Sequence, residues 1–201
     1  MLTIAINDKG VQPLFARLAR MGREPRELTL PAARDVANLL KRHYRENESQ
    51  PVKHPGEKRH FWREVGKTVQ APVEANGGRS AVISITHPAI RQKALGGTIT
   101  AKRARALTIP ISAEAYEAGT VATFEHETGQ QLFAIGKSED GTRGVLASRN
   151  DDGSISLHWL LRKSVNQKPD PRALPPIAEM IRVAVDRMRK VFERIIARSQ
   201  G

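Results

Sequence analysis

Residues 94–102 read ALGGTITAK, and after a short basic link residues 106–111 read ALTIPI. The pair Gly96-Gly97 allows the backbone to turn, or to approach a neighbour where a Cβ would clash. Pro110 lies within an apolar run and cannot donate a ladder hydrogen bond, so it predicts an edge strand or a strand end. This block shapes and joins backbone, and it holds no carboxylate or histidine suited to acid–base chemistry.

On both sides of this block, the sequence predicts short strands separated by turns. Apolar and β-branched runs predict strands at 2–6, 81–86, 107–111, 131–135, 144–148 and 154–161. The segments Glu139-Asp140-Gly141 and Asn150-Asp151-Asp152-Gly153 each lie between two such runs, which is a strong signal for a β-hairpin. The sequence therefore predicts a mainly antiparallel sheet with long hairpins.

Helical patterns precede the strands. Apolar residues at helical spacing predict helices at 11–21 and at 30–44, the second with Thr29 as its N-cap and Pro31 in its first turn. A shorter helix is predicted around 58–69. Within the strand region, Ser112 is expected to cap a short helical turn.

The C-terminal part begins with a proline-rich segment, 168–176, which is predicted to be extended. The last helix follows at 176–199, and its apolar residues recur at a heptad-like spacing. This helix packing seam consists of Ile177, Ile181, Ala184, Met188, Val191 and Ile195. A single helix laid across a sheet is the favoured interpretation, with a coiled coil as the alternative.

These patterns together predict an α+β fold, with N-terminal helices, a mainly antiparallel sheet and a long C-terminal helix packed on the sheet. The length of 201 residues fits one domain over 1–201. That domain would have a helical part at 1–70, a β-rich part with a hairpin excursion at 80–165, and the C-terminal helix at 176–199. The hydrophobic content of 39% is low, so either a modest core or a core completed by neighbouring subunits is expected.

Composition excludes several classes of protein. The chain has no cysteine, which rules out a disulfide framework and thiolate chemistry. No apolar run approaches the length of a membrane span, and residues 1–6 lack the features of a signal peptide. A soluble intracellular product is the expectation.

The chain is strongly basic, with a net charge of +12. Residues 75–113 contain no acid, and the cations of this stretch include Arg91, Lys93, Lys102, Arg103 and Arg105. These five form a candidate patch that faces a DNA channel or an acidic protein, and the alternative is a solvated loop. Because residues 91–105 contain no aromatic side chain for stacking, base readout is not expected.

Candidate catalytic residues are few. The six histidines are scattered, and no two have the i, i+4 spacing of a helical zinc site. The segment Glu125-His126-Glu127 lacks the second histidine of a metalloprotease helix. The sequence therefore predicts no catalytic residue, cofactor or metal, and an enzyme centred on His126 remains the alternative.

Several segments, taken in order, resemble the phage virion-morphogenesis proteins, a group of tail-completion and head–tail joining proteins. The matching segments are HFW at 60–62, VISI at 82–85, IRQ at 90–92, GGTI at 96–99, ALTIP at 106–110, EAY at 114–116 and LLRKSV at 160–165. The proline-rich segment that leads into the last helix also matches. Extra hairpins at about 125–159 depart from the family pattern.

The resemblance implies a structural subunit that forms a ring, with six-fold symmetry expected, between the capsid portal and the tail. Implied partners are copies of the chain itself, the portal or head–tail connector, tail terminator or tail-tube proteins, and packaged DNA through nonspecific contact; no membrane is involved. The protein would belong to the virion neck or tail and assemble in the bacterial cytoplasm. A nonspecific DNA-binding module that uses residues 91–105 is the alternative function.

Overall fold

The computed structural model describes residues 1–6, 25–51, 60–136, 138–139 and 142–198, with the backbone alone at 6 and 195–198. These residues form helices and antiparallel sheets, which confirms the α+β class. They group into two compact units, where the sequence predicted one domain. The difference arises because the hairpin strands bury a hydrophobic cluster of their own, separate from that of the flanking helices.

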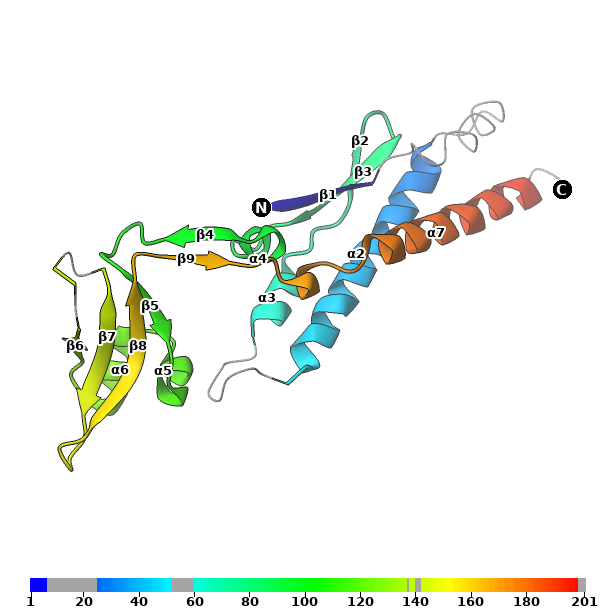
Figure 1. The fold of residues 1–201 in the computed structure, drawn as a ribbon. Helices are drawn as coiled ribbons and strands as arrows, with labels where there is room; N and C mark the ends of the chain where they lie inside the picture. The colour runs from blue at the N-terminus through cyan, green and yellow to red at the C-terminus, as the bar shows by residue number, and fades with distance from the viewer. Residues whose placement is uncertain (7–24, 52–59, 137, 140–141, 199–201) are drawn as a thin grey trace. The chain divides into compact units, whose positions relative to one another are not determined.

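Unit 1 is formed by the described residues within Met1–Ser49, His60–Leu95 and Pro169–Gly201. It contains a three-stranded antiparallel sheet of order β1-β3-β2, together with helices that pack on it (Figure 1). Its elements are β1 (Leu2–Ile6), α2 (Arg26–Ser49), α3 (Phe61–Lys67), β2 (Val73–Ala75), β3 (Ser80–Ile85), α4 (Ile90–Leu95), the 3-10 turn η2 (Pro171–Ala173) and α7 (Ile177–Arg198). The predicted strand at 2–6 and helices near 30–44, 58–69 and 176–199 are confirmed, whereas the predicted helix at 11–21 lies outside the described residues.

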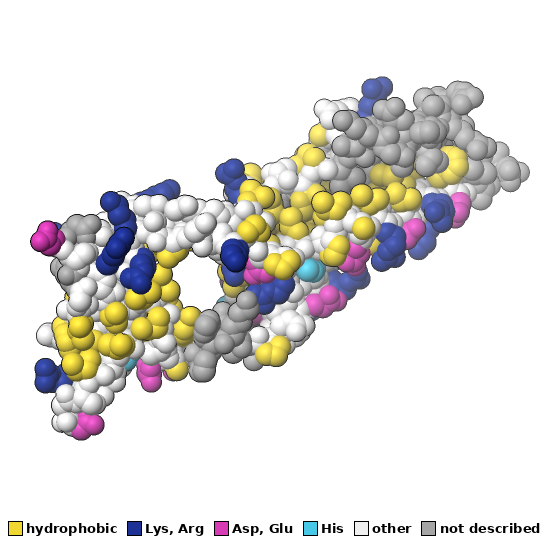
Figure 2. Space-filling view, viewed as in Figure 1, with side chains coloured by type: hydrophobic (Ala, Val, Ile, Leu, Met, Phe, Trp, Pro, Cys, Tyr) yellow, Lys and Arg dark blue, Asp and Glu magenta, His cyan; other side chains and the backbone are white. Residues whose placement is uncertain are grey.

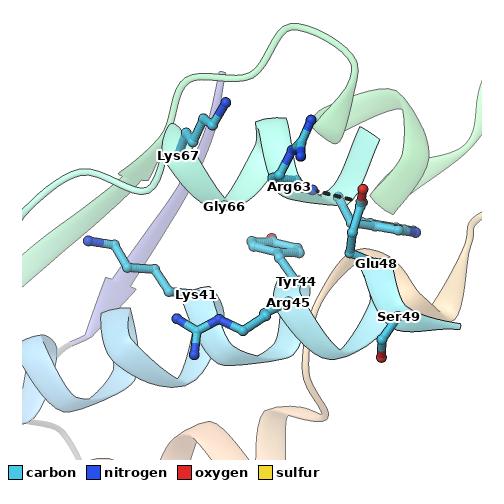
Figure 3. A pocket seen from close by; sticks show the side chains of 9 residues that line it. Lys41, Tyr44, Arg45, Glu48, Ser49, Arg63, Gly66 and Lys67 are labelled. Atoms are coloured by element: carbon cyan, nitrogen blue, oxygen red, sulfur yellow. Dashed lines mark hydrogen bonds between the residues drawn. The ribbon is translucent and has the colours of Figure 1, made fainter. Parts of the chain in front are cut away.

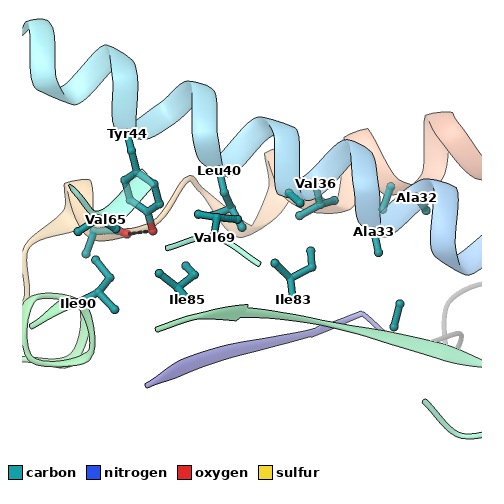
Figure 4. Close-up of a cluster of buried hydrophobic side chains, with 14 of the residues drawn as sticks. Ala32, Ala33, Val36, Leu40, Tyr44, Val65, Val69, Ile83, Ile85 and Ile90 are labelled. Atoms are coloured by element: carbon teal, nitrogen blue, oxygen red, sulfur yellow. Dashed lines mark hydrogen bonds between the residues drawn. The ribbon is translucent and has the colours of Figure 1, made fainter. Parts of the chain in front are cut away.

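The core of unit 1 lies between α2 and β3 (Figure 4). Val36 and Leu40 on α2 point toward Ile83 and Ile85 on β3, and all four side chains are buried. Burial of each such aliphatic side chain contributes about 1.5–3 kcal/mol. The apolar side chains that alternate along β3 and those that recur at helical spacing on α2 therefore pack together in one layer.

The start of α2 differs from the prediction. The helix begins at Arg26, so Thr29 lies inside its first turns and is not the N-cap. The Thr29 hydroxyl is buried and donates a hydrogen bond to the carbonyl oxygen of Gly78 at 2.7 Å. Thr29 thus ties the helix to the turn between β2 and β3, a tertiary role that local capping signals do not reveal.

We expect Gly78→Ala to lower the free energy of unfolding of unit 1 by about 2 kcal/mol or more. Gly78 has φ +85°, and a Cβ there would lie 2.8 Å from Arg26 Cβ and 3.0 Å from its backbone nitrogen. Gly77→Ala is the matched control, since Gly77 has φ +61° but no atom within 4 Å of an added Cβ. Thermal denaturation should show the larger loss for Gly78→Ala; equal losses would mean that the contact with Arg26 is unimportant.

The C-terminal helix α7 packs along α2 and shares its hydrophobic cluster (Figure 1). Of the predicted seam, Ala184 and Met188 are buried and Val191 is half-buried. The seam was wrong at its N-terminal end, where Ile177 is 72% and Ile181 is 57% exposed. The cluster instead takes Met180 and Val183 from these turns, and also Phe192 further along. Ile177 and Ile181 lie on nearly the same side of the helix as Met188. Their exposure therefore reflects which stretch of α7 the neighbouring helix covers, and the spacing within one helix does not specify this. The side chain of Ile195 is outside those that the structure describes.

The proline-rich segment is not extended throughout, because the 3-10 turn η2 interrupts it. Asp170 accepts hydrogen bonds from the backbone N of Arg172 at 3.0 Å and from its guanidinium, and lies 3.5 Å from Lys93 Nζ. Burial raises the pKa of Asp170, but the hydrogen bonds and charge of Arg172, with Lys93, outweigh it and lower the pKa to about 2. The Asp170 carboxylate thus stabilises a turn in a segment that the prolines alone predicted to be extended.

Unit 2 is formed by the described residues within Gln50–Arg59 and Gly96–Lys168. Its main sheet is antiparallel and has the order β5-β8-β7-β6, and β4 and β9 form a separate two-stranded sheet (Figure 1). Its elements are β4 (Gly97–Thr100), β5 (Leu107–Pro110), α5 (Ala113–Ala118), α6 (Val121–Thr128), β6 (Phe133–Ile135), β7 (Gly144–Arg149), β8 (Ile155–Arg162) and β9 (Ser164–Gln167). The predicted β7–β8 hairpin at Asn150–Gly153 is confirmed, and α6, β4 and β9 were not predicted.

Candidate assembly surface

One face of the four-stranded sheet in unit 2 is covered by helices. Trp159 on β8 and Leu146 on β7 are paired across the ladder, and both pack with Phe124 of α6. Ala115 and Ala118 of α5 complete this cluster. Because side chains alternate along a strand, the residues between these point to the opposite face.

That opposite face is largely apolar, and the register also places Arg149 beside Ile155 and Arg162 beside Leu107 on it. The register places two cross-strand rows on it, Ile135–Val145–Leu160–Ile109 and Phe133–Ala147–Leu157. A register shift between Leu146 and Ala147, opposite His158, keeps Trp159 and Leu157 on different faces. We call this surface the open sheet face; its apolar members are Leu107, Ile109, Phe133, Ile135, Val145, Ala147, Ile155, Leu157 and Leu160.

The open sheet face is accessible to solvent within unit 2. Phe133 and Ile135 are 37% and 38% exposed, and Ile155 and Leu157 are 48% and 49% exposed. Hydrophobic side chains gather over these strands in Figure 2. An antiparallel sheet with one solvated face ordinarily alternates apolar and polar residues, so a largely apolar second face is a candidate surface for contact with another chain.

A second apolar patch lies on unit 1. Ile177 and Ile181, the two seam residues that unit 1 leaves exposed, are one helical turn apart near the start of α7. Residues at i and i+4 lie on the same face of a helix, so the two form one surface, which we call the α7 patch.

The predicted basic patch is divided by the structure. Arg91 and Lys93 belong to α4 in unit 1, whereas Lys102, Arg103 and Arg105 are exposed in the link between β4 and β5 of unit 2. Lys93 is also engaged, because its Nζ lies 3.5 Å from Asp170 and 5.3 Å and 5.7 Å from the ring centroids of Phe61 and Trp62. The five cations therefore do not form one surface on either unit.

The glycine and proline predictions are confirmed. Gly96 and Gly97 have φ values of +67° and +113°, which L-residues rarely adopt, at the entry to β4. Pro110 is the last residue of β5, an edge strand, and is paired with Trp159. These residues shape the backbone that leads into the four-stranded sheet.

His126, the residue on which the alternative of an enzyme depends, is exposed on α6. The neighbouring Glu125 carboxylate accepts a hydrogen bond from the backbone N of Leu132 at 3.0 Å, a local structural role. Within the described ranges, no three or more His, Asp or Glu side chains are placed to hold a metal ion.

A buried polar cluster that sequence reasoning missed lies under α5. His158 Nδ1 is 3.0 Å from Ser112 Oγ, and its Nε2 is 2.9 Å from Ser148 Oγ. Ser112 also caps α5 by accepting from the backbone N of Ala115, as predicted. The only sequence signal for the cluster was that cap, because His158 and Ser148 lie on the β7–β8 hairpin, far from Ser112 in the sequence. Both ring nitrogens are engaged, which suits a neutral imidazole that donates once and accepts once.

The stability of unit 2 should fall as the pH drops below about 6.5, the ordinary pKa of histidine. Burial lowers the pKa of His158, and the charge of Glu114 opposes this only in part. The unfolded chain therefore binds the proton first, so the stabilisation is complete above the unfolded pKa and is lost toward acid. Urea denaturation at several pH values should show this slope, and His158→Gln should abolish it.

His126→Gln is the matched control, since His126 is exposed on a helix of the same unit. It should retain the pH dependence of the wild type above about pH 4.5, the ordinary pKa of glutamate; hydrogen bonds from its own backbone and from Ser112 lower the pKa of the neighbouring Glu114. A wild-type profile that is flat between these two pH values would contradict the assignment of a neutral His158.

Among the described helices, none combines the length and apolar character needed to cross a membrane. Comparisons of the chain with protein-family models, with curated proteins and with solved structures gave no match.

Proposed function

We propose that this chain is a structural subunit of a tailed-bacteriophage virion, which forms a ring that completes the tail or joins it to the capsid portal. The observation that carries the proposal is the open sheet face. Leu157 and Ile155 are about half exposed at its centre and end, in a sheet whose other face already packs on α5 and α6. A soluble subunit with this surface gains stability when another chain covers it.

A ring requires each subunit to present two different complementary surfaces, because a head-to-tail contact repeated by rotation joins unlike patches. The chain has two separate apolar surfaces, the open sheet face on unit 2 and the α7 patch on unit 1. This supports a second copy of the chain as the occupant. The α7 patch is small, so the sheet face is the one expected to supply most of the buried area.

The virion setting comes from the resemblance to phage virion-morphogenesis proteins. In that setting the partners are the portal or head–tail connector on one side and tail terminator or tail-tube proteins on the other. The ring would lie in the neck of the virion, with six-fold symmetry, after assembly in the bacterial cytoplasm. The chain would act by assembly alone, without a cofactor.

The proposal predicts that the purified chain forms rings and that Leu157→Asp converts them to monomers. Leu157 is 49% exposed, so the new carboxylate costs little in the monomer but would be buried in the assembly. Ala122→Asp, at an exposed position on α6 at the helix-covered side of the sheet, is the matched control and should still form rings.

Light scattering and negative-stain microscopy measure the outcome, and thermal denaturation checks that all three proteins are folded. A wild-type chain that remains monomeric at every concentration would sink the proposal. Rings formed equally well by Leu157→Asp would show that the open sheet face is not the contact.

A further inference from the structure

A groove in unit 1 lies between the last turns of α2 and the short helix α3 (Figure 3). Its volume is about 570 Å³. Four cationic side chains line it, Lys41 and Arg45 from α2, and Arg63 and Lys67 from α3. None of them belongs to the basic segment that the sequence singled out.

The floor of the groove is rigid and buried. The rings of Tyr44 and Trp62 are stacked, with centroids 6.0 Å apart and an interplanar angle of 8°. The Tyr44 hydroxyl donates to the carbonyl oxygen of Ala173 at 3.0 Å, which fixes the ring from behind. Gly66 forms part of the wall, and a Cβ there would lie 3.5 Å from Tyr44 Cβ. The shape is therefore set by packed groups before any ligand arrives.

The cations of α2 at this groove are not neutralised locally. Lys41 and Arg45 stand at i and i+4, where like charges destabilise a helix, and no ion pair joins either to an acid in the described part of the chain. On another face of the same helix, Arg42 and Glu46 at the same spacing form an ion pair at 3.8 Å. The ion pair of Arg42 and Glu46 therefore lies away from the groove, whereas the two cations Lys41 and Arg45 line it.

The cations of α3 pair with one exposed acid, Glu64, and the Arg63 guanidinium also lies 2.9 Å from His60 Nδ1. Lys67 Nζ lies 2.8 Å from Glu64 Oε1, and both side chains are about half exposed or more. Exposed pairs of this kind contribute little and can exchange for another anion. Glu48 is the one carboxylate in the lining, and it accepts a hydrogen bond from the backbone N of Arg63 at 3.0 Å. The lining therefore has four cations against one acid.

We propose that this groove binds the phosphate backbone of double-stranded DNA without reading its sequence. Residues four apart rise about 6 Å along a helix, so each helix offers two cations in a row to successive phosphates. Single-stranded nucleic acid requires aromatic faces on which bases stack, but Tyr44 is 0% and Trp62 is 8% exposed. The same burial leaves no aromatic anchor for a protein partner. The net charge of +12 adds long-range attraction to a polyanion.

The test measures binding of the full chain to a labelled mixed-sequence DNA duplex by fluorescence anisotropy, across about 50 to 200 mM salt. The wild-type affinity should fall steeply with salt. The double variant Lys41→Ala, Arg45→Ala should bind about tenfold more weakly at the low-salt end, and the magnitude of its log–log salt slope should decrease by about 2.

The matched control is Arg189→Ala, Lys190→Ala, which removes the same charge from exposed positions on α7 in the same unit. It should keep the wild-type slope. Equal losses in the two double variants would overturn the proposal, since net charge alone would then explain binding. Tighter binding of polyglutamate than of duplex would also overturn it, in favour of an acidic protein partner. Both variants should retain the thermal stability of the wild type, because all four replaced side chains are exposed.

Discussion

Met188→Asp is expected to unfold unit 1, with a loss of about 4 kcal/mol in its free energy of unfolding. Met188 is buried between α7 and α2, in the same cluster as Ala184 and Leu40. The substitution removes a packed side chain. It also buries a new carboxylate among apolar side chains, where burying a charge without a partner is costly. Urea denaturation in a Trp159→Phe background, in which Trp62 of unit 1 is the remaining tryptophan, measures the loss by fluorescence.

Ile181→Asp is the matched control for this prediction. It makes the same kind of change one heptad earlier on the predicted seam, but Ile181 is largely exposed. In the monomeric Leu157→Asp background, where no other copy covers the α7 patch, Ile181→Asp should change the free energy of unfolding by no more than about 0.5 kcal/mol. If Ile181→Asp destabilises unit 1 as much as Met188→Asp does, the side of α7 that faces α2 has been assigned incorrectly.

The comparison of these two residues shows what the sequence could predict about α7 and what it could not. The spacing of apolar residues established the helix, and its bounds were predicted within a residue or two. The spacing did not establish which part of the apolar stripe is buried, because this depends on where α2 lies. The periodicity of one helix carries no information about the direction of its neighbour.

Strands were predicted where side chains alternate strongly or turns are marked by glycine. The alternation in β3 and the Asn150–Gly153 turn are local signals, and both elements are present. Strand β9, SVNQ, is polar and short, and its pairing with β4 becomes visible only when Ile99 meets Val165 across the ladder. Such pairing depends on contacts distant in sequence, so local patterns do not reveal it.

Functional surfaces were harder to predict than elements for the same reason. The cluster of cations at 91–105 is contiguous in sequence, but it is divided between two compact units. By contrast, the groove cations come from α2 and α3, and Lys41 and Lys67 are separated by many residues. The open sheet face likewise requires the register of four strands, including the shift at Leu146, before its members can be listed.

Trp159→Ala is expected to unfold unit 2, with a loss of about 3–5 kcal/mol. Trp159 is fully buried, and among the described residues the cluster around it has three other buried members, Ala115, Ala118 and Phe124. Two of these are alanines, so the tryptophan supplies the largest share of the apolar surface that the sheet buries against α5 and α6. A core this small has little other burial with which to offset the cavity.

The two tryptophans of the chain make this result directly measurable, since Trp62 belongs to unit 1 and Trp159 to unit 2. In Trp159→Ala, the fluorescence of Trp62 should still report a cooperative transition near that of the wild type, while circular dichroism loses the strand signal of unit 2. Trp62→Phe is the complementary variant, because it leaves Trp159 as the reporter of unit 2. Loss of the Trp62 transition in Trp159→Ala would contradict the division of the hydrophobic residues into two cores, because neither cluster includes a residue of the other.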